Sequence, residues 1–376
     1  MIYLDNSATT KCYPQVIQLQ AQLSEECYFN PSAGYHASVE AHQRLEDARK
    51  RIAVQLGCQP AELIFTASGT EGDNLAIFGA FKNKKGRIIT SEAEHPAVFQ
   101  CFQHLKNSGY DVQFVRLNQD STVDLTHLRE LLTPNTTFVS VMHVQNETGA
   151  VNDIAAITAL CKTANSECLV HSDGVQAFLK IPVDMRSLGV DLYTVSAHKV
   201  HGPKGVGALY VRKGVNPSLY SFGGGQEHGL RSGTENLPGI SAFALACEIS
   251  RENMEFHRLG SIKRLMRDII CKKCENVVVQ ADRDDSAPNI LSLSVKGIKA
   301  EILQQVLSNE GIFIGKGSAC SSKAKISRLH KALKLPADLA EGTIRISISY
   351  LNEESECRQA AEIIAEQIQM LRRKIR

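Results

Sequence analysis

One lysine follows an apolar run so closely that its amine could do chemistry. The octapeptide SAHKVHGP, residues 196–203, comes directly after GVDLYTV, which is typical of a buried strand. It groups Ser196, His198 and Lys199 at the strand end. A lysine is rarely buried unless it is paired or used in a reaction. Alone, this lysine fits a solvated strand end better than a reactive amine, so the other strand ends decide between the two interpretations.

Polar residues follow four other apolar runs in the same way. Each has an ordinary interpretation when taken alone, as a helix cap, a turn or a solvated side chain. The residues are Gly69 and Thr70 after ELIFT, His95 after GRIIT, Asn146 after FVSVMHV, and Asp173 and Gln176 after CLV. In parallel sheets, ligands bind beyond the carboxyl ends of the strands. We therefore expect these side chains to meet at one edge of a sheet.

The combined set fits one cofactor. The segment ASGTEGDN opens an expected helix, whose free N–H groups bind an anion such as phosphate, with Ser68 and Thr70 adding hydroxyl donors. A carboxylate, an amide, an imidazole and a lysine complete the set. Pyridoxal phosphate needs a lysine for a Schiff base and a carboxylate to keep its ring nitrogen protonated. Five coincident strand ends favour this interpretation over separate caps and turns.

The elements that position these residues alternate between strand and helix patterns from about residue 60. Seven β-rich runs lie between residues 62 and 212, most of them separated by amphipathic segments such as 151–165. Such alternation predicts a mainly parallel sheet covered by helices on both faces. A short Gly- and Pro-containing loop joins the last two runs, which indicates an antiparallel pair. An apolar-periodic stretch over 235–270 predicts a linking helix before a second, smaller series of strands and helices.

Composition excludes several classes of protein. The 376 residues are 43% hydrophobic and 22% charged, with a net charge of +2, which gives no reason to expect nucleic acid as a partner. No apolar run is long enough to cross a bilayer, and MIYLDNSATT does not resemble a signal peptide, so we expect a cytoplasmic protein. The 11 cysteines have no framework spacing, which favours free thiols. The pair CKKC, 271–274, is a weak zinc signal without a second pair, and no metal site is predicted.

Motifs along nearly the whole chain resemble one known family. They are YLDNSATT, SGTEGDNLAI, EHPAV, MHVQNETGAV, HSDGVQ, SAHKVHGPKGVGALYVR, GGGQEHGLRSGTENLPGI, GSACSS and TIRISIS. They resemble the cysteine desulfurases of the NifS/IscS type, in the class V aminotransferase superfamily of fold-type-I pyridoxal-phosphate enzymes. The resemblance implies an α/β fold with a mainly parallel seven-stranded sheet and a smaller α+β C-terminal domain. We expect a large cofactor domain over 14–250 and a small domain formed by 1–13 and 251–376.

The resemblance also implies roles for individual residues. Lys199 would form the Schiff base, Asp173 would pair with the ring nitrogen, and His95 would stack on the ring and move protons. Arg345 would bind the substrate carboxylate, a task that suits a guanidinium. Asn146 and Gln176 would hydrogen-bond the ring oxygen and its surroundings, and Asn146 would also contact the substrate. Phosphate binding would involve Gly69, Thr70, Ser196 and His198. Asn6 would line the substrate pocket, and Thr234 would contact the phosphate of the other subunit in a homodimer.

Cys320, in a loop over about 315–328, would be the nucleophile by the same resemblance. It would take sulfur from L-cysteine as a persulfide, release L-alanine, and pass the sulfur to an acceptor protein that serves iron–sulfur clusters or another thio-cofactor. Lys316, Lys323 and Lys325 would favour its thiolate. A basic, solvated loop with an incidental cysteine is the plainer interpretation of these residues without the resemblance.

Two other functions stay open. A selenocysteine lyase or related pyridoxal-phosphate β-lyase would keep its turnover without Cys320. A non-catalytic sulfur-relay or scaffold protein would be expected to lose at least one of Lys199, Asp173, His95 and Arg345, and all four are present.

Overall fold

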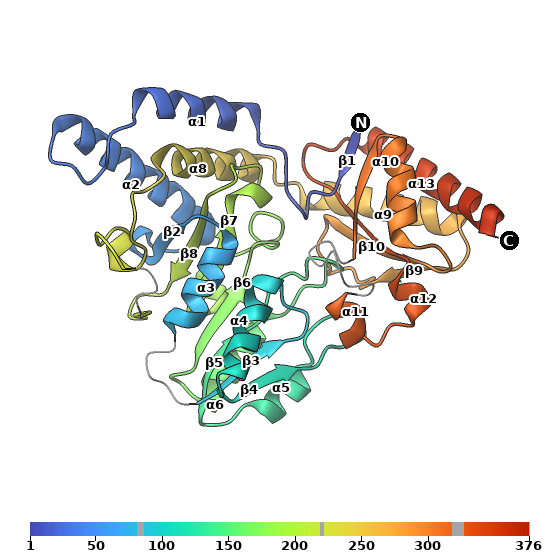
Figure 1. The fold of residues 1–376 in the computed structure, drawn as a ribbon, viewed down its shortest axis with the longest axis horizontal. Coiled ribbons are helices and arrows are strands. Elements are labelled where there is room, and N and C mark those ends of the chain that lie inside the picture. Colours follow the sequence, from blue (N-terminus) through green and yellow to red (C-terminus); the bar gives the residue numbers. More distant parts are fainter. Residues whose placement is uncertain (81–85, 219–221, 318–326, 376) are drawn as a thin grey trace.

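A seven-stranded sheet forms the centre of the larger part of the chain. The computed structural model describes residues 1–80, 86–218, 222–317 and 327–375, and Figure 1 shows their arrangement. The sheet has the order β2-β8-β7-β6-β5-β3-β4. Its strands are β2 (Leu63–Thr66), β3 (Arg87–Ser91), β4 (Val112–Val115), β5 (Thr136–Ser140), β6 (Leu169–Asp173), β7 (Leu192–Ser196) and β8 (Gly207–Val211). Only β8 runs antiparallel to its neighbours, which confirms the predicted fold class and the antiparallel last pair.

Helices cover both faces of this sheet. Successive residues of a strand therefore pack in two different hydrophobic clusters, one on each face. Tyr193 of β7 packs in one cluster with residues of α2 and α8, whereas its neighbour Leu192 packs in another with residues of α3 and α4. The helices of this part are α1 (Pro14–Glu26), α2 (His36–Leu56), α3 (Gly69–Gly79), α4 (Pro96–Asn107), α5 (Leu125–Leu131), α6 (Ile154–Ala164), α7 (Met185–Leu188) and α8 (Leu237–Glu252). Strand side chains that alternate between two helix layers explain the near-continuous hydrophobicity of the runs.

A second sheet, with the order β1-β11-β12-β10-β9, forms the smaller part. Its strands are β1 (Ile2–Leu4), β9 (Val277–Gln280), β10 (Ile290–Val295), β11 (Ile312–Lys316) and β12 (Thr343–Ser347). Its helices are α9 (Phe256–Lys273), α10 (Ala300–Asn309), α11 (Arg328–Ala332), α12 (Ala337–Ala340) and α13 (Glu354–Ile375). The N-terminal strand β1 pairs in parallel with β11, so the two ends of the chain share this sheet (Figure 1).

The linking segment differs from the single helix predicted over 235–270. It forms two helices, α8 and α9, with a break at residues 253–255. The Asn253 side chain donates to the carbonyl of Ile249, and this local bond competes with continuation of α8. The chain leaves the first sheet for the second at this break, while the domain boundaries given above stay a prediction.

Within the described ranges, no helix is both long and apolar enough to span a membrane.

Candidate active site

A cavity of about 570 Å³ lies beyond the carboxyl ends of β2, β3, β5, β6 and β7. This is where a parallel α/β sheet places its ligands. Most of the residues predicted from the strand ends line it, namely Gly69, Thr70, His95, Asn146, Asp173, Gln176, Ser196, His198 and Lys199, and Arg345 joins them from β12. Residues far apart in sequence therefore share one wall, as the strand-end argument predicts.

Lys199 ends a 3-10 turn, Ala197–Lys199, that follows β7 directly. Its Nζ donates to the carbonyl oxygens of Ser7 at 2.5 Å and Ala8 at 2.7 Å. The N-terminal segment thus reaches from the small sheet to the amine of the large one. Two carbonyl acceptors stabilise the ammonium form of Lys199.

Asp173 is the last residue of β6 and is 5% exposed. One carboxylate oxygen accepts the N–H of Val175 at 2.9 Å. Burial raises the pKa of Asp173 to about 6, while the Val175 N–H and the Lys199 ammonium lower it. Asp73 of α3 is also buried, and burial together with the charge of Asp173 raises its pKa well above its ordinary value. Asp173 is therefore the member of this pair that carries a negative charge near neutral pH.

His95 caps α4, and this contact fixes its neutral tautomer. Its Nδ1 accepts the N–H of Ala97 at 3.2 Å. Burial lowers the pKa of His95 to about 4, and the positive charges of Lys199 and Arg328 add to the effect. The ring is therefore uncharged at neutral pH, with Nδ1 as the acceptor and the proton on Nε2.

The start of α3 and the end of β7 form an anion cradle. Ser68 caps α3 by accepting the N–H of Glu71 at 3.1 Å, and Gly69 is the first helical residue. The Ser196 side chain is 2% exposed, and its Oγ has no hydrogen-bond partner within the part of the chain that the structure describes. His198 Nδ1 lies 3.1 Å from the hydroxyl of Thr9. A buried hydroxyl without a partner, beside a helix N-terminus, suits a bound phosphate.

Gln176 and Asn146 lie between the two sheets. The Gln176 amide donates to the Ser7 carbonyl at 2.9 Å, and its oxygen accepts from Lys180 Nζ at 2.9 Å. Burial lowers the pKa of Lys180 well below its ordinary value, with the nearby Lys199 contributing. The carbonyl of Asn146 accepts from Arg345 at 2.8 Å.

The cavity residues that were not predicted from the sequence include three charged side chains, Glu94, Glu147 and Arg328. Burial raises the pKa of Glu94 to about 8 and that of Glu147 to about 7. The guanidinium of Arg328 donates to the carbonyls of Glu92 and Glu94, and its Cζ lies 3.6 Å from the ring centroid of Phe99. A glutamate before His95 and another after Asn146 were the available signals, whereas nothing near Arg328 in the sequence indicated its position.

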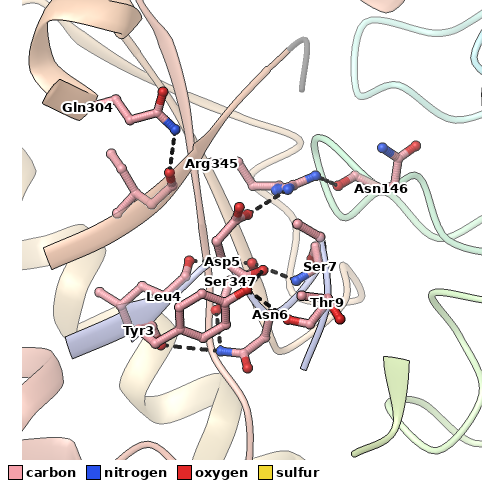
Figure 2. A network of polar contacts seen from close by, with 12 residues as sticks. Tyr3, Leu4, Asp5, Asn6, Ser7, Thr9, Asn146, Gln304, Arg345 and Ser347 are labelled. Atoms are coloured by element: carbon pink, nitrogen blue, oxygen red, sulfur yellow. Dashed lines mark hydrogen bonds and ion pairs between the residues drawn. The ribbon is translucent and has the colours of Figure 1, made fainter. Parts of the chain in front are cut away.

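Two predicted residues, Asn6 and Thr234, do not line this cavity. Asn6 is buried, and its amide donates to the Ser347 carbonyl at 2.9 Å (Figure 2). Ser7 and Ala8 line the cavity wall in its place. Asn6 therefore anchors the N-terminal segment. Thr234 is exposed and away from this cavity, so its contact with another subunit stays a prediction. Cys320 lies outside the described residues.

The described residues contain no group of three or more His, Cys, Asp or Glu side chains arranged to hold a metal ion. Cys271 lies in α9 and is exposed, whereas Cys274 is the buried C-cap of the same helix.

The chain belongs to the aminotransferase class V family, whose pattern it matches over residues 2–359. Two relatives are a cysteine desulfurase of Nostoc sp., 36% identical over 99% of this chain and 94% of its own, and the cysteine desulfurase IscS of Escherichia coli, 37% identical over 99% and 93%. Among solved structures, a NifS-like protein matches with a TM-score of 0.91 and 34% identity, covering 98% of this chain and 99% of that one. SspA in complex with cysteine matches with a TM-score of 0.82 and 28% identity, covering 94% and 100%.

Proposed function

We infer that the chain is a pyridoxal-phosphate-dependent cysteine desulfurase. One observation carries this conclusion: a single cavity contains Lys199, Asp173, His95 and Arg345. Its relatives named cysteine desulfurase span nearly the whole chain, which supports the same function.

The cavity residues fit pyridoxal phosphate. The N-terminus of α3 and the Ser196 hydroxyl, which has no partner in the described parts of the chain, suit the phosphate. The buried carboxylate of Asp173 suits a protonated ring nitrogen. When bound, the cofactor supplies an aldehyde that bonds to amines and a ring that accepts electrons from the adjacent carbon.

The chain's own groups would then bind the substrate and move its protons. Arg345 would bind the carboxylate of L-cysteine, and the carbonyls of Ser7 and Ala8 would stabilise Lys199 whenever its amine is protonated. Lys199 would take the proton from the α-carbon as a general base. His95, neutral with its proton on Nε2, is suited to donate a hydrogen bond from that atom.

Sulfur transfer is the part of the proposal that rests on the family resemblance. The Cys320 thiolate would attack the substrate sulfur, the carbon–sulfur bond would break, and L-alanine would leave after protonation. The persulfide would pass to an acceptor protein. A cytoplasmic homodimer, in which Thr234 contacts the phosphate of the other subunit, completes the proposal.

Absorbance tests the proposed role of Lys199. Wild-type protein mixed with pyridoxal phosphate should gain a visible band that borohydride converts to a stable adduct on Lys199. The Lys199→Ala variant should lose the adduct, whereas the variant Lys204→Ala, at an exposed lysine in the loop before β8, should keep it. A wild-type protein that gains no band would overturn the proposal.

A further inference from the structure

Arg345 reaches across a neighbouring strand to meet the N-terminal segment. It lies on β12, next to β11, and β11 in turn pairs with β1. Its NH2 group donates to Asp5 Oδ1 at 2.7 Å, although the two residues lie at opposite ends of the sequence (Figure 2). Strands on either side of β11 are two spacings apart, about 9.6 Å, a width that the arginine and aspartate side chains cover together.

Gly315 makes this crossing possible. It pairs with Arg345 in the sheet, and a Cβ added there would lie 2.6 Å from Asp5 Oδ1, 2.9 Å from Arg345 NH2 and 3.0 Å from Arg345 Nε. Any side chain at this position would occupy the space of the ion pair. The glycine in IFIGKG is therefore explained by close approach rather than by a turn.

The guanidinium keeps donors for a further ligand. Its side chain is 3% exposed, and among the described residues it donates to the carbonyl of Asn146 and to Asp5. A guanidinium has five N–H donors. The Nε is buried and has no partner among the residues described, and the side chain lines the cavity. Arg345 is thus held by two groups while part of its donor set stays available.

The Asp5 carboxylate is itself fixed by its backbone. The Tyr3 hydroxyl donates to the carbonyl of Asp5 at 3.0 Å. Two residues later, the N–H of Ser7 donates to the Ser347 hydroxyl at 2.9 Å (Figure 2). Both bonds tie the segment to the small sheet, so Asp5 offers Arg345 a charged partner in a defined place. A buried cation without such a partner costs free energy and loses its fixed orientation.

We propose that Asp5 is a positioning residue for substrate binding, which rests on the proposed function. It holds the Arg345 guanidinium flat across β11, so that the remaining N–H groups receive the α-carboxylate of the amino acid substrate. The two carboxylates share the guanidinium, and Asp5 is not displaced. Without Asp5, the Arg345 guanidinium keeps its charge but is no longer held in the orientation that receives the substrate carboxylate.

Steady-state kinetics on the cofactor-loaded enzyme test this role. In Asp5→Ala, KM for L-cysteine should rise about tenfold with kcat changed less than twofold, since one charge-assisted hydrogen bond orients the carboxylate site. Asp5→Asn keeps an oxygen acceptor and should raise KM by only about threefold. Gly315→Ala should raise KM as well, because its methyl group displaces the pair. Asp338→Asn, which removes an exposed ion pair with Lys296 in the same part of the chain, should leave KM unchanged.

Ligands with and without a carboxylate separate positioning from general damage to the fold. Binding of L-alanine, which needs no turnover, should weaken about tenfold in Asp5→Ala. Binding of ethylamine, which lacks the carboxylate, should not change. Equal weakening for both ligands, or unchanged or tighter L-alanine binding, would overturn the role of Asp5. A failure of the proposed function is distinguishable, because it would leave the wild type unable to release alanine from L-cysteine.

Discussion

The buried ion pair between Arg49 and Glu227 should be the most sensitive structural contact outside the cavity. The two side chains are 3% and 1% exposed, and the carboxylate accepts both terminal nitrogens of Arg49 at 2.8 Å. It also accepts the N–H of Phe65 in β2 at 2.7 Å. Glu227 has a φ of 47°, in the left-handed region, so the pair also fixes a strained turn before Thr234.

Replacing Glu227 with Gln keeps the shape and removes the charge. The amide would turn its NH₂ toward a guanidinium that also donates, so at least one bond would be lost. The buried arginine would keep the partly exposed Glu46, 3.0 Å from its Nε, as a counter-ion. Removing one partner of a buried pair costs about 3–5 kcal/mol, and because Glu46 stays we expect Glu227→Gln to lower the free energy of unfolding by about 3 kcal/mol.

Urea unfolding, followed by circular dichroism, measures this loss. The matched control is Glu40→Gln in the same region, which breaks an exposed pair with Arg44 and should cost about 0.5 kcal/mol or less. Adding Arg49→Met to Glu227→Gln should recover part of the stability, because it removes the buried cation that has lost its buried partner. A loss below about 1 kcal/mol for Glu227→Gln would refute the reasoning.

Two other predictions concern the cofactor site and the response to pH. Because the Ser196 hydroxyl has no partner among the described residues, Ser196→Ala should weaken pyridoxal phosphate binding about tenfold without lowering the stability of the cofactor-free protein. A fluorescence titration and a melting curve measure the two effects, and a destabilised apoprotein would contradict the first. Burial lowers the pKa of His330 to about 4, so the unfolded chain takes up its proton first, and this side chain alone lowers stability by up to about 1.4 kcal/mol per pH unit as pH drops from 6.5 toward 4. Other histidines with a lowered pKa, such as His95, add to the fall, so His330→Leu should make the slope shallower by that one contribution, and equal pH slopes for both proteins in unfolding experiments would contradict it.

The strand ends made much of the site predictable from the sequence. Each parallel strand ends at the same edge of the sheet, so Asp173 at the end of β6 and Lys199 after β7 lie close together because these two strands are parallel neighbours. The cap position of His95 followed from the proline after it. These inferences needed only local patterns and one rule about topology.

Contacts between the two sheets could not be predicted in this way. The carbonyls of Ser7 and Ala8 meet Lys199 because β1 joins the small sheet, and no periodicity near residue 7 indicates that. For the same reason Ser7, and not the predicted Asn6, lines the cavity. Arg328 reaches the cavity from α11 for the same reason. Such contacts depend on how the two sheets pack against each other, and this packing brings together residues that are distant in the sequence.

Alanine release from L-cysteine by the cofactor-loaded enzyme tests the central claim most directly. We predict that wild type and Cys271→Ser, a control at an exposed cysteine of α9, release alanine at the same rate, and that Cys320→Ser does not turn over. Wild-type protein should also carry a persulfide on Cys320 that mass spectrometry detects after one turnover. Full activity of Cys320→Ser would contradict the account, because sulfur would then leave without that thiol, as in a lyase.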